Sequence, residues 1–302
     1  MEYIESLLTQ HGMSDSKPVT TPMNEKPSMA DTTSGQLQDL ARQQANHEIS
    51  DKEAEQLTKE IHEQKAYLEK MKNQKRGYRN IIGGLSHLAR RARNEIQFAT
   101  FYLSRYQNDP GRKHYIAAKR ILRYLQGTKN LTNRADLTKP LLEIYVDSDL
   151  AGDPDKNRST TGYTILMYGV PIATKSRLQQ EPTKSSTNAE IQALVDATEM
   201  AIWIKNLLLE MNIEIIPTIK SDSQPTIDTI RNQKLLKGNK HCARRYHFVK
   251  GYVERGDIKL EYIPTAKNIA DMYTKPLAKN KFDYFRNQFL FDPDETKTKA
   301  NE

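Results

Sequence analysis

The chain has 302 residues, 37% of them hydrophobic and 28% charged, with a formal net charge of +8. This composition predicts a water-soluble protein of one or two packed domains, and the positive balance favours a polyanionic partner over an acidic one. The single cysteine, Cys242, excludes an internal disulfide and fits a reducing compartment. No apolar run reaches the ~18 residues that a membrane helix needs, and the first residues lack a secretory signal pattern.

The N-terminal part predicts helices joined by polar segments. Residues 1–23 contain a short amphipathic helical pattern followed by an extended stretch with two prolines. Residues 24–49 are polar and predict a linker. Residues 50–75 predict a solvated charged helix, with partial disorder and a packed helix both left open, and Ser50 and Glu53 would begin it as a capping box.

Residues 77–138 predict a small helical unit. Within it, stripes of apolar residues recur at helical spacing, and Gly127 would end the last helix. Its helices also carry basic residues, which could be solvated helix faces or contacts with a phosphate backbone. These residues are Arg90, Arg91, Arg93, Lys119, Arg120 and Arg123.

From residue 139 onward the pattern changes to alternating strands and longer helices. The order is three strands, a helix, a strand, two helices, a strand and a helix, which predicts an α/β domain with a mixed sheet and helices around it. The strands are expected at residues 142–147, 162–169, 170–176, 216–221 and 258–263, and the helices at 187–211, from Pro225, at 240–254 and from Asn268.

Four carboxylates in this second half have settings that could aim them at one point. Asp147 and Asp222 lie near the ends of predicted strands, and Glu190 and Asp271 lie near the starts of predicted helices. In this element order, such positions can converge at one edge of the sheet. Gathered carboxylates repel one another unless cations lie between them, and oxygen ligands suit Mg²⁺. The residues therefore predict a divalent-metal site, where two ions could clamp the attacking and leaving oxygens of a phosphodiester cleavage.

Each carboxylate also has a structural interpretation that the sequence leaves open. Glu190 could form a capping box with Thr187, although it also lies on the inward stripe of its helix. Asp271 could simply suit the positive end of a helix, and Asp222 could form a turn. Asp147 lies on the less apolar face of its strand, where a structural role is the alternative.

Basic residues around these acids are candidates for nucleic-acid contacts, with plain surface charges as the alternative. They are Lys175, Arg177, Lys184, Lys240, Arg244 and Arg245. His241 and His247 lie in the same region and are interpreted as ordinary helix residues, because no metal-ligand spacing accompanies them.

Several strings in the right order make residues 141–290 resemble the ribonuclease H domain of copia-type (Pseudoviridae) LTR retrotransposon polyproteins. The strings are Tyr145-Val-Asp-Ser-Asp-Leu-Ala-Gly-Asp153, Arg158-Ser-Thr-Thr-Gly-Tyr163, Ser185-Ser-Thr-Asn-Ala-Glu190, Lys240-His241, Arg245-Tyr-His-Phe248 and Asn268-Ile-Ala-Asp-Met-Tyr-Thr-Lys-Pro-Leu277. Upstream, strings such as Lys119-Arg-Ile-Leu-Arg-Tyr-Leu-Gln-Gly-Thr128 resemble the segment that joins reverse transcriptase to that domain.

This resemblance implies a division of the chain into parts. They are residues 1–23, a remnant of the C-terminal end of reverse transcriptase; 24–76, a polar linker and charged helix; 77–138, a helical connection segment; and 139–302, a ribonuclease H-like domain.

The resemblance also implies a fold and an activity, namely a ribonuclease H-like mixed five-stranded sheet that cleaves the RNA strand of an RNA–DNA hybrid. At the matching positions, Asp147, Glu190, Asp222 and Asp271 would be the catalytic and metal-binding residues for two Mg²⁺ ions, with Mn²⁺ as a substitute. Asp147 would bridge both ions, Glu190 and Asp222 would complete one, and Asp271 would help to hold the other. The hybrid would be recognised through phosphates and RNA 2′-hydroxyls, and other polyprotein parts would be further partners, in cytoplasmic virus-like particles or in the nucleus.

The chain also departs from the family pattern. The metal-binding acids of the polymerase precede the position that matches Met1, so no polymerase activity is expected. Where the family commonly has Thr-Arg-Pro-Asp, this chain has Ala92-Arg-Asn-Glu95, and residues 264–268 carry no histidine, unlike the loop of the cellular enzymes. These differences leave open a second hypothesis, a catalytically silent transposon relic or hybrid-binding module, and a third, a basic helical scaffold.

Overall fold

The chain forms two compact units, Met1–Asn130 and Leu131–Glu302. The computed structural model describes residues 1–46, 48–72, 77–182, 185–231 and 240–293. Within these ranges, no helix has the length and apolar character needed to cross a membrane.

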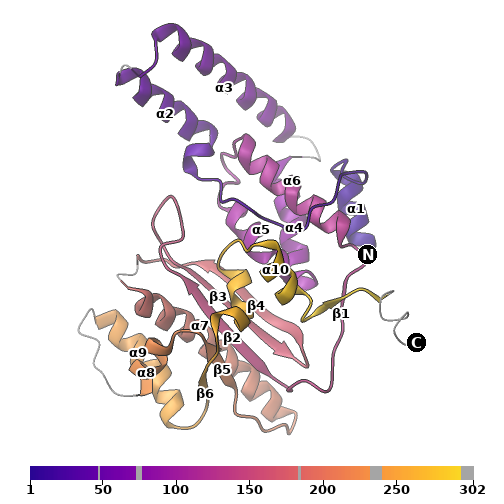
Figure 1. Cartoon of the computed structure of the whole chain (residues 1–302), viewed down its shortest axis with the longest axis vertical. Helices are drawn as coiled ribbons and strands as arrows, with labels where there is room; N and C mark the ends of the chain where they lie inside the picture. Colours follow the sequence, from indigo (N-terminus) through magenta and orange to yellow (C-terminus); the bar gives the residue numbers. More distant parts are fainter. Residues whose placement is uncertain (47, 73–76, 183–184, 232–239, 294–302) are drawn as a thin grey trace. The chain divides into compact units, whose positions relative to one another are not determined.

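Helices build the first unit (Figure 1). They are α1 (Glu2–Gln10), η1 (Met29–Asp31), α2 (Thr33–Ala45), α3 (Asp51–Lys72), α4 (Tyr78–Arg91), η2 (Asn94–Ile96), α5 (Gln97–Ser104) and α6 (Arg112–Gly127). The helical unit predicted after residue 77 is confirmed, since α4, α5 and α6 bury their apolar stripes, with Leu85, Leu103 and Ile121 fully enclosed. The short N-terminal helix is confirmed as α1.

The prediction of a linker over residues 24–49 is wrong, because this segment contains η1 and α2. Ser28 begins η1 by donating its backbone N–H to Asp31 Oδ2 at 2.8 Å. Thr32 begins α2, and its hydroxyl accepts a hydrogen bond from the backbone N–H of Gly35 at 3.0 Å. Caps of this kind stabilise the start of a helix whose composition is otherwise polar.

The capping box predicted at the start of α3 is confirmed. The backbone N–H of Ser50 donates to Glu53 Oε2 at 3.0 Å, and the backbone N–H of Glu53 donates to Ser50 Oγ at 3.3 Å. Each residue thereby satisfies a backbone donor of the other, which is what defines the motif.

Several basic residues of the first unit make contacts inside it. Arg93 is 2% exposed and pairs with Glu95, its Nε lying 2.7 Å from Oε1, which excludes a contact between Arg93 and a phosphate backbone. Arg120 donates to the backbone carbonyl and hydroxyl of Thr21 at 3.1 and 3.0 Å, and Arg123 donates to the carbonyl of Lys17 at 2.7 Å. Helix α6 thus uses its arginines to hold the extended segment that follows α1.

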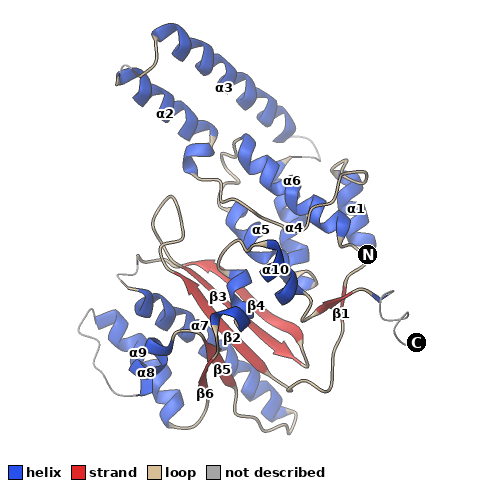
Figure 2. Cartoon of the chain, viewed as in Figure 1, coloured by secondary structure: helices blue, strands red, loops and turns tan. Residues whose placement is uncertain are grey.

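A mixed five-stranded sheet organises the second unit (Figure 2). The strand order is β4-β3-β2-β5-β6, in which β2, β3 and β4 are antiparallel neighbours and β5 and β6 join in parallel. The strands are β2 (Glu143–Asp149), β3 (Thr160–Met167), β4 (Val170–Leu178), β5 (Thr218–Ser221) and β6 (Lys259–Tyr262). This arrangement confirms the ribonuclease H-like mixed five-stranded sheet with flanking helices.

Three helices share one hydrophobic core with a face of this sheet. They are α7 (Ser186–Glu210), α8 (Gln224–Arg231) and α9 (Lys240–Glu254), labelled beside the sheet in Figure 1. On the sheet side, Ile144 and Val146 of β2 enter this core, two residues apart as strand geometry requires. The inward stripe predicted on α7 is confirmed. Its members are Leu194, Ala197, Ala201, Ile204 and Leu208.

The other face of the sheet carries η4 (Ile269–Tyr273), which contacts β2 and β3. Gly162 of β3 is in register with Asp147 of β2 on this face. A Cβ atom at Gly162 would lie 2.6 Å from Thr274 Cγ2 and 3.1 Å from the carbonyl carbon of Tyr273. Glycine therefore allows the backbone of this segment to approach the sheet closely.

The single helix predicted from Asn268 is instead two elements, so this prediction is wrong. The elements are η4 and α10 (Lys279–Arg286), and η3 (Thr265–Lys267) precedes them. Pro276 separates η4 from α10, because proline lacks a backbone donor and disfavours helical geometry in the residue before it. Asn268 still caps the first element, since its Oδ1 accepts a hydrogen bond from the backbone N–H of Ala270 at 3.2 Å.

The second unit begins before the start predicted at residue 139. Its first strand, β1 (Thr132–Asn133), pairs antiparallel with its last, β7 (Leu290–Phe291). This pairing joins the two ends of the unit across the sequence. A strand this short carries no periodicity of its own, so the local pattern could not predict it.

The buried Arg93–Glu95 pair provides a test of the first unit. Glu95 is fully buried, and its Oε1 also accepts a hydrogen bond from the Tyr124 hydroxyl at 3.3 Å. Replacing Arg93→Met should lower the free energy of unfolding of this unit by about 3–5 kcal/mol, because a buried carboxylate loses its cation. Urea unfolding of the full chain, followed by circular dichroism, measures the change.

The control is Arg91→Met, which removes an exposed arginine at the end of α4. It should change the free energy of unfolding by less than about 0.5 kcal/mol. Equal effects of the two substitutions would contradict the assigned role of the ion pair.

Candidate metal centre

The parallel pairing of β2 and β5 brings two of the predicted carboxylates to one edge of the sheet. Val146 of β2 is in register with Ser221 of β5. Asp147 and Asp222 follow these residues, and because the strands run in the same direction, both lie toward the same end. Asn268 joins the two strands, since its Nδ2 donates to the carbonyl of Val146 at 2.9 Å and to Asp222 Oδ1 at 3.1 Å.

Glu190 reaches the same edge from the first turns of α7. The predicted capping box of Thr187 and Glu190 is wrong, because the helix begins earlier. Ser185 is the N-cap, and its hydroxyl accepts a hydrogen bond from the backbone N–H of Asn188 at 3.3 Å. Glu190 therefore lies within the helix and is buried, near the end where the helix dipole favours a negative charge.

Asp147, Glu190 and Asp222 form a compact acidic triad. Each offers one carboxylate oxygen, and these oxygens all lie within 4.8 Å of one another. Asp147 and Glu190 are buried and Asp222 is half-buried. Oε2 of Glu190 has no hydrogen-bond partner among the described residues, which is costly unless a proton or a cation satisfies it. A donor set of carboxylate oxygens fits a divalent cation such as Mg²⁺.

Burial changes the pKa of two of these carboxylates, Asp147 and Glu190. Burial raises the pKa of Asp147 to about 7; the Lys275 ammonium opposes this shift, and the charges of Asp271 and Asp222 add to it. Burial also raises the pKa of Glu190 well above its usual range, and the charge of Asp147 adds to the effect. Both shifts show how strongly this site disfavours an uncompensated negative charge.

Asp271 lies beside the acidic triad, but its carboxylate forms ion pairs with two lysines. It is fully buried on η4, with Lys275 Nζ 2.7 Å from Oδ1 and Lys281 Nζ paired with Oδ2. Lys275 Nζ also lies 3.8 Å from Asp147 Oδ2, which accepts a hydrogen bond from the Thr274 hydroxyl. The structure thus groups three of the predicted carboxylates and links Asp271 to Asp147 through an ammonium group.

The sequence predicted no part in the site for Thr274, Lys275 or Lys281, and predicted only the start of a helix at Asn268. Thr274, Lys275 and Asn268 belong to the string that ends at Leu277 and carries the resemblance, and this string was the signal that could have identified them. Lys281 lies on α10 and gives no local signal, because only the fold brings it to Asp271.

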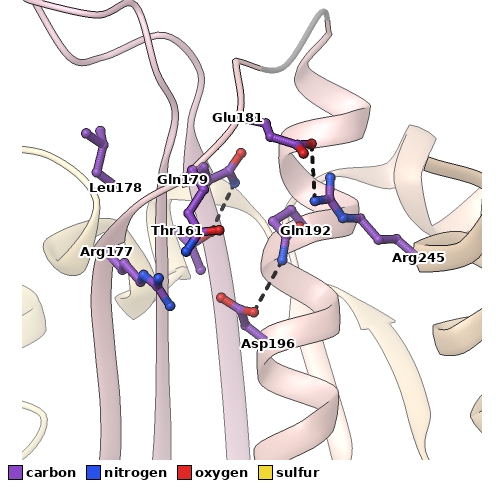
Figure 3. Close-up of a pocket in the computed structure, with 9 residues that line it drawn as sticks. Thr161, Arg177, Leu178, Gln179, Glu181, Gln192, Asp196 and Arg245 are labelled. Carbon is purple, nitrogen blue, oxygen red and sulfur yellow. Dashed lines mark hydrogen bonds and ion pairs between the residues drawn. The ribbon is translucent and has the colours of Figure 1, made fainter. Parts of the chain in front are cut away.

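Two of the residues predicted to contact nucleic acid line the same polar pocket, which has a volume of about 180 Å³ (Figure 3). Arg177 lies at the end of β4 and Arg245 on α9. Gln179 also lines the pocket, and its Nε2 donates to the carbonyl of Ala189 at 3.0 Å. Since Ala189 directly precedes Glu190, this hydrogen bond ties the pocket wall to the part of α7 that carries one member of the acidic triad.

The remaining predicted contacts differ from one another. Lys175 pairs with Asp196, its Nζ lying 2.9 Å from Oδ2, so that this ammonium is already compensated. Arg244 is exposed on α9. Lys184 and the side chain of Lys240 lie outside the described residues.

Two Pol polyproteins of plant transposons are similar in sequence to nearly the whole chain. The retrovirus-related Pol polyprotein from transposon TNT 1-94 of Nicotiana tabacum is 31% identical over 283 residues, which are 93% of this chain and 19% of that protein. The Pol polyprotein from transposon RE1 of Arabidopsis thaliana is 31% identical over 292 residues, or 95% of this chain and 17% of that protein. The chain belongs to the copia-type retrotransposon Pol polyproteins and spans less than a fifth of the length of these relatives.

Similar proteins also include shorter ones. Secreted RxLR effector protein 161 of Plasmopara viticola is 36% identical over 130 residues, which are 42% of this chain and 90% of that protein. LC11-RNase H1, isolated from compost, is 21% identical with a TM-score of 0.36, over 44% of this chain and 91% of that one. The structure of LC11-RNase H1 with an RNA/DNA hybrid is 18% identical with a TM-score of 0.35, over 44% and 93%. No protein-family model matches the chain.

The raised pKa of Asp147 predicts how stability depends on pH in the absence of metal. The folded chain keeps a proton on Asp147 up to about pH 7, whereas the unfolded chain releases it near 3.8. The free energy of unfolding should therefore fall as the pH rises between these values. In EDTA, the fall from about pH 5 to about pH 7.5 should be smaller in Asp147→Asn than in the wild type, by about 2–3 kcal/mol, measured by urea unfolding.

Asp257→Asn is the control with the opposite sign. Hydrogen bonds from Lys205 and Arg255 lower the pKa of the Asp257 carboxyl, so its contribution is lost only at more acidic pH. This substitution should leave the slope between about pH 5 and about pH 7.5 unchanged. Parallel curves for the wild type and Asp147→Asn would contradict the assigned burial of the Asp147 charge.

Proposed function

We propose that this chain is a divalent-metal-dependent hydrolase that cleaves the RNA strand of RNA–DNA hybrids. The observation that carries this proposal is the buried acidic triad of Asp147, Glu190 and Asp222, whose oxygens lie within 4.8 Å at one edge of the sheet. Such a group requires compensation by cations if it is to be ionised at neutral pH. Membership of a Pol polyprotein family and the net charge of +8 support a nucleic-acid substrate.

The roles of the carboxylates follow from their positions. Asp147, Glu190 and Asp222 would hold one Mg²⁺, and Asp147 with Asp271 would hold a second, with Mn²⁺ as a substitute. Bound there, the ions would supply an activated water and neutralise the charge that develops at the scissile phosphate. The chain itself contributes orientation, because Asn268 fixes the carboxylate of Asp222 against the backbone of β2.

The hybrid would bind through its phosphates at the pocket that Arg177 and Arg245 line. Arg177 is exposed, and among the described residues it has no ion-pair partner. Arg245 pairs with Glu181 at 3.5 Å, and both side chains are accessible, so the pair is weak. Guanidinium groups suit phosphate oxygens, and further contacts with RNA 2′-hydroxyls would select the strand to be cut.

The wider context follows from the family. Residues 1–23 would correspond to the end of reverse transcriptase, 77–138 to the connection segment, and the second unit to the hydrolase. The hydrolase would act beside the other parts of such a polyprotein, in the cytoplasm or the nucleus. A reducing compartment fits the single cysteine.

A catalytically silent hybrid-binding module is the second candidate function. The state of Asp271 favours it, because Lys275 and Lys281 engage both carboxylate oxygens where a second cation would have to bind. Salt-sensitive binding of a hybrid without any turnover would support this candidate.

Cleavage of a labelled RNA–DNA hybrid in Mg²⁺ tests the proposed activity. The chain should shorten the RNA strand, and Asp147→Asn should reduce the rate at least about 100-fold, because it removes the carboxylate shared by both proposed ion positions. Asp228→Asn, which changes an exposed carboxylate on α8, should retain the activity. Equal rates in the wild type and Asp147→Asn would end the hydrolase assignment, and binding without cleavage would favour the silent module.

The proposed phosphate contacts make a separate prediction about affinity. Arg177→Ala and Arg245→Ala should each weaken hybrid binding, and each should reduce the slope of log affinity against log salt by about 1, because one phosphate contact is lost. Fluorescence anisotropy in EDTA at several salt concentrations measures both quantities. Arg286→Ala, whose guanidinium already pairs with Asp283, is the matched control and should leave the slope unchanged.

A further inference from the structure

The carboxylate of Asp271 forms ion pairs with two ammonium groups. It is fully buried, Lys275 Nζ lies 2.7 Å from Oδ1, and Lys281 Nζ contacts Oδ2. Lys275 Nζ also lies 3.8 Å from Asp147 Oδ2, so it lies between two buried carboxylates. This arrangement compensates the negative charge on the η4 side of the acidic triad without a metal ion.

We propose that Lys275 and Lys281 are resident cations of Asp271 and control the entry of the second divalent cation. This inference rests on the proposed hydrolase site. Together the two lysines engage both oxygens that Asp271 could offer to a divalent cation, so they compete with such an ion for this carboxylate. The two lysines are therefore positioning residues that act on metal affinity.

The location of the lysines allows such an exchange. Their side chains are 35% and 32% exposed, whereas the Asp271 side chain is 0% exposed. Lys275 follows η4 and Lys281 lies on α10, so the two ammonium groups reach Asp271 from different elements. A lysine ammonium is a point charge on a flexible stem, and it can leave for solvent or for a substrate phosphate while the backbone stays in place.

The charge balance gives the direction of the effect. Two ammonium groups beside Asp271 repel an incoming divalent cation and occupy its ligand oxygens. Removing them leaves a buried carboxylate without compensation, which makes the metal-free protein less stable and a bound cation more favourable. The lysines should thus weaken the second ion site and affect the acidic triad of Asp147, Glu190 and Asp222 much less.

Titration of the full chain with Mn²⁺ tests the inference, with free Mn²⁺ counted by electron paramagnetic resonance. In Lys275→Gln/Lys281→Gln, the second Mn²⁺ should bind at least about tenfold more tightly than in the wild type, because repulsion and competition are removed. The first Mn²⁺ should change little. Mn²⁺ should also raise the unfolding temperature of this variant more than that of the wild type.

Matched variants separate this role from a merely structural one. Lys279→Gln removes a lysine of α10 that pairs with Asp283 instead, and it should leave both affinities unchanged. Lys275→Arg keeps the positive charge and should retain weak binding of the second ion. Adding Asp271→Asn to the double variant should abolish the gain, because it removes the ligand that the lysines release.

The outcomes distinguish the inference from the proposed function. An unchanged second affinity in the double variant, or in the single variant Lys281→Gln if the double variant does not fold, would overturn the role of the lysines and leave the hydrolase proposal intact. A wild-type chain that binds no Mn²⁺ would instead overturn the metal site on which the hydrolase proposal rests.

Discussion

Burying several negatively charged carboxylates close together costs free energy, and this cost determines which groups surround the site in the second unit. Asp147, Glu190 and Asp271 are 4%, 7% and 0% exposed, and water cannot stabilise their charges. The remaining means are protonation, ammonium groups, hydrogen-bond donors and metal ions. Burial raises the pKa values of Asp147 and Glu190, which favours their protonated forms. Lys275 and Lys281 pair with Asp271, and the Thr274 hydroxyl donates a hydrogen bond to Asp147. Each of these compensates a negative charge that a divalent cation could also neutralise.

The fold supplies this concentration of charge by combining elements from both faces of one sheet. Parallel pairing of β2 and β5 aligns Asp147 with Asp222, and α7 adds Glu190 from the side of the hydrophobic core. On the opposite face, the absence of a side chain at Gly162 lets η4 approach β2 and β3. The elements that carry or precede the acidic triad, namely β2, β5 and α7, also pack the hydrophobic core, which fixes their relative positions.

In the first unit, it is positively charged arginine side chains that find their partners inside the protein. Arg93 is buried against Glu95, while Arg120 and Arg123 donate to the backbone of the extended segment after α1. A row of basic residues on a helix suggested either solvent or a phosphate backbone as its partner. For these arginines the partners are groups of the same unit, whose carbonyl oxygens and carboxylates need donors once they leave water.

The sequence by itself determined the elements whose residues have a clear period, including the strands around Ile144 and Ile219 and the inward stripe of α7. It also predicted that four carboxylates converge, because strand ends and helix starts have definite places in an α/β domain, and three of them form the acidic triad. Only the tertiary structure decided that Ser185 is the N-cap of α7 and that β1 pairs with β7. It also decided that Lys275 and Lys281 form ion pairs with Asp271. These outcomes depend on contacts between residues far apart in the chain or on competition among neighbouring caps, and local periodicity reports only which face of an element is buried.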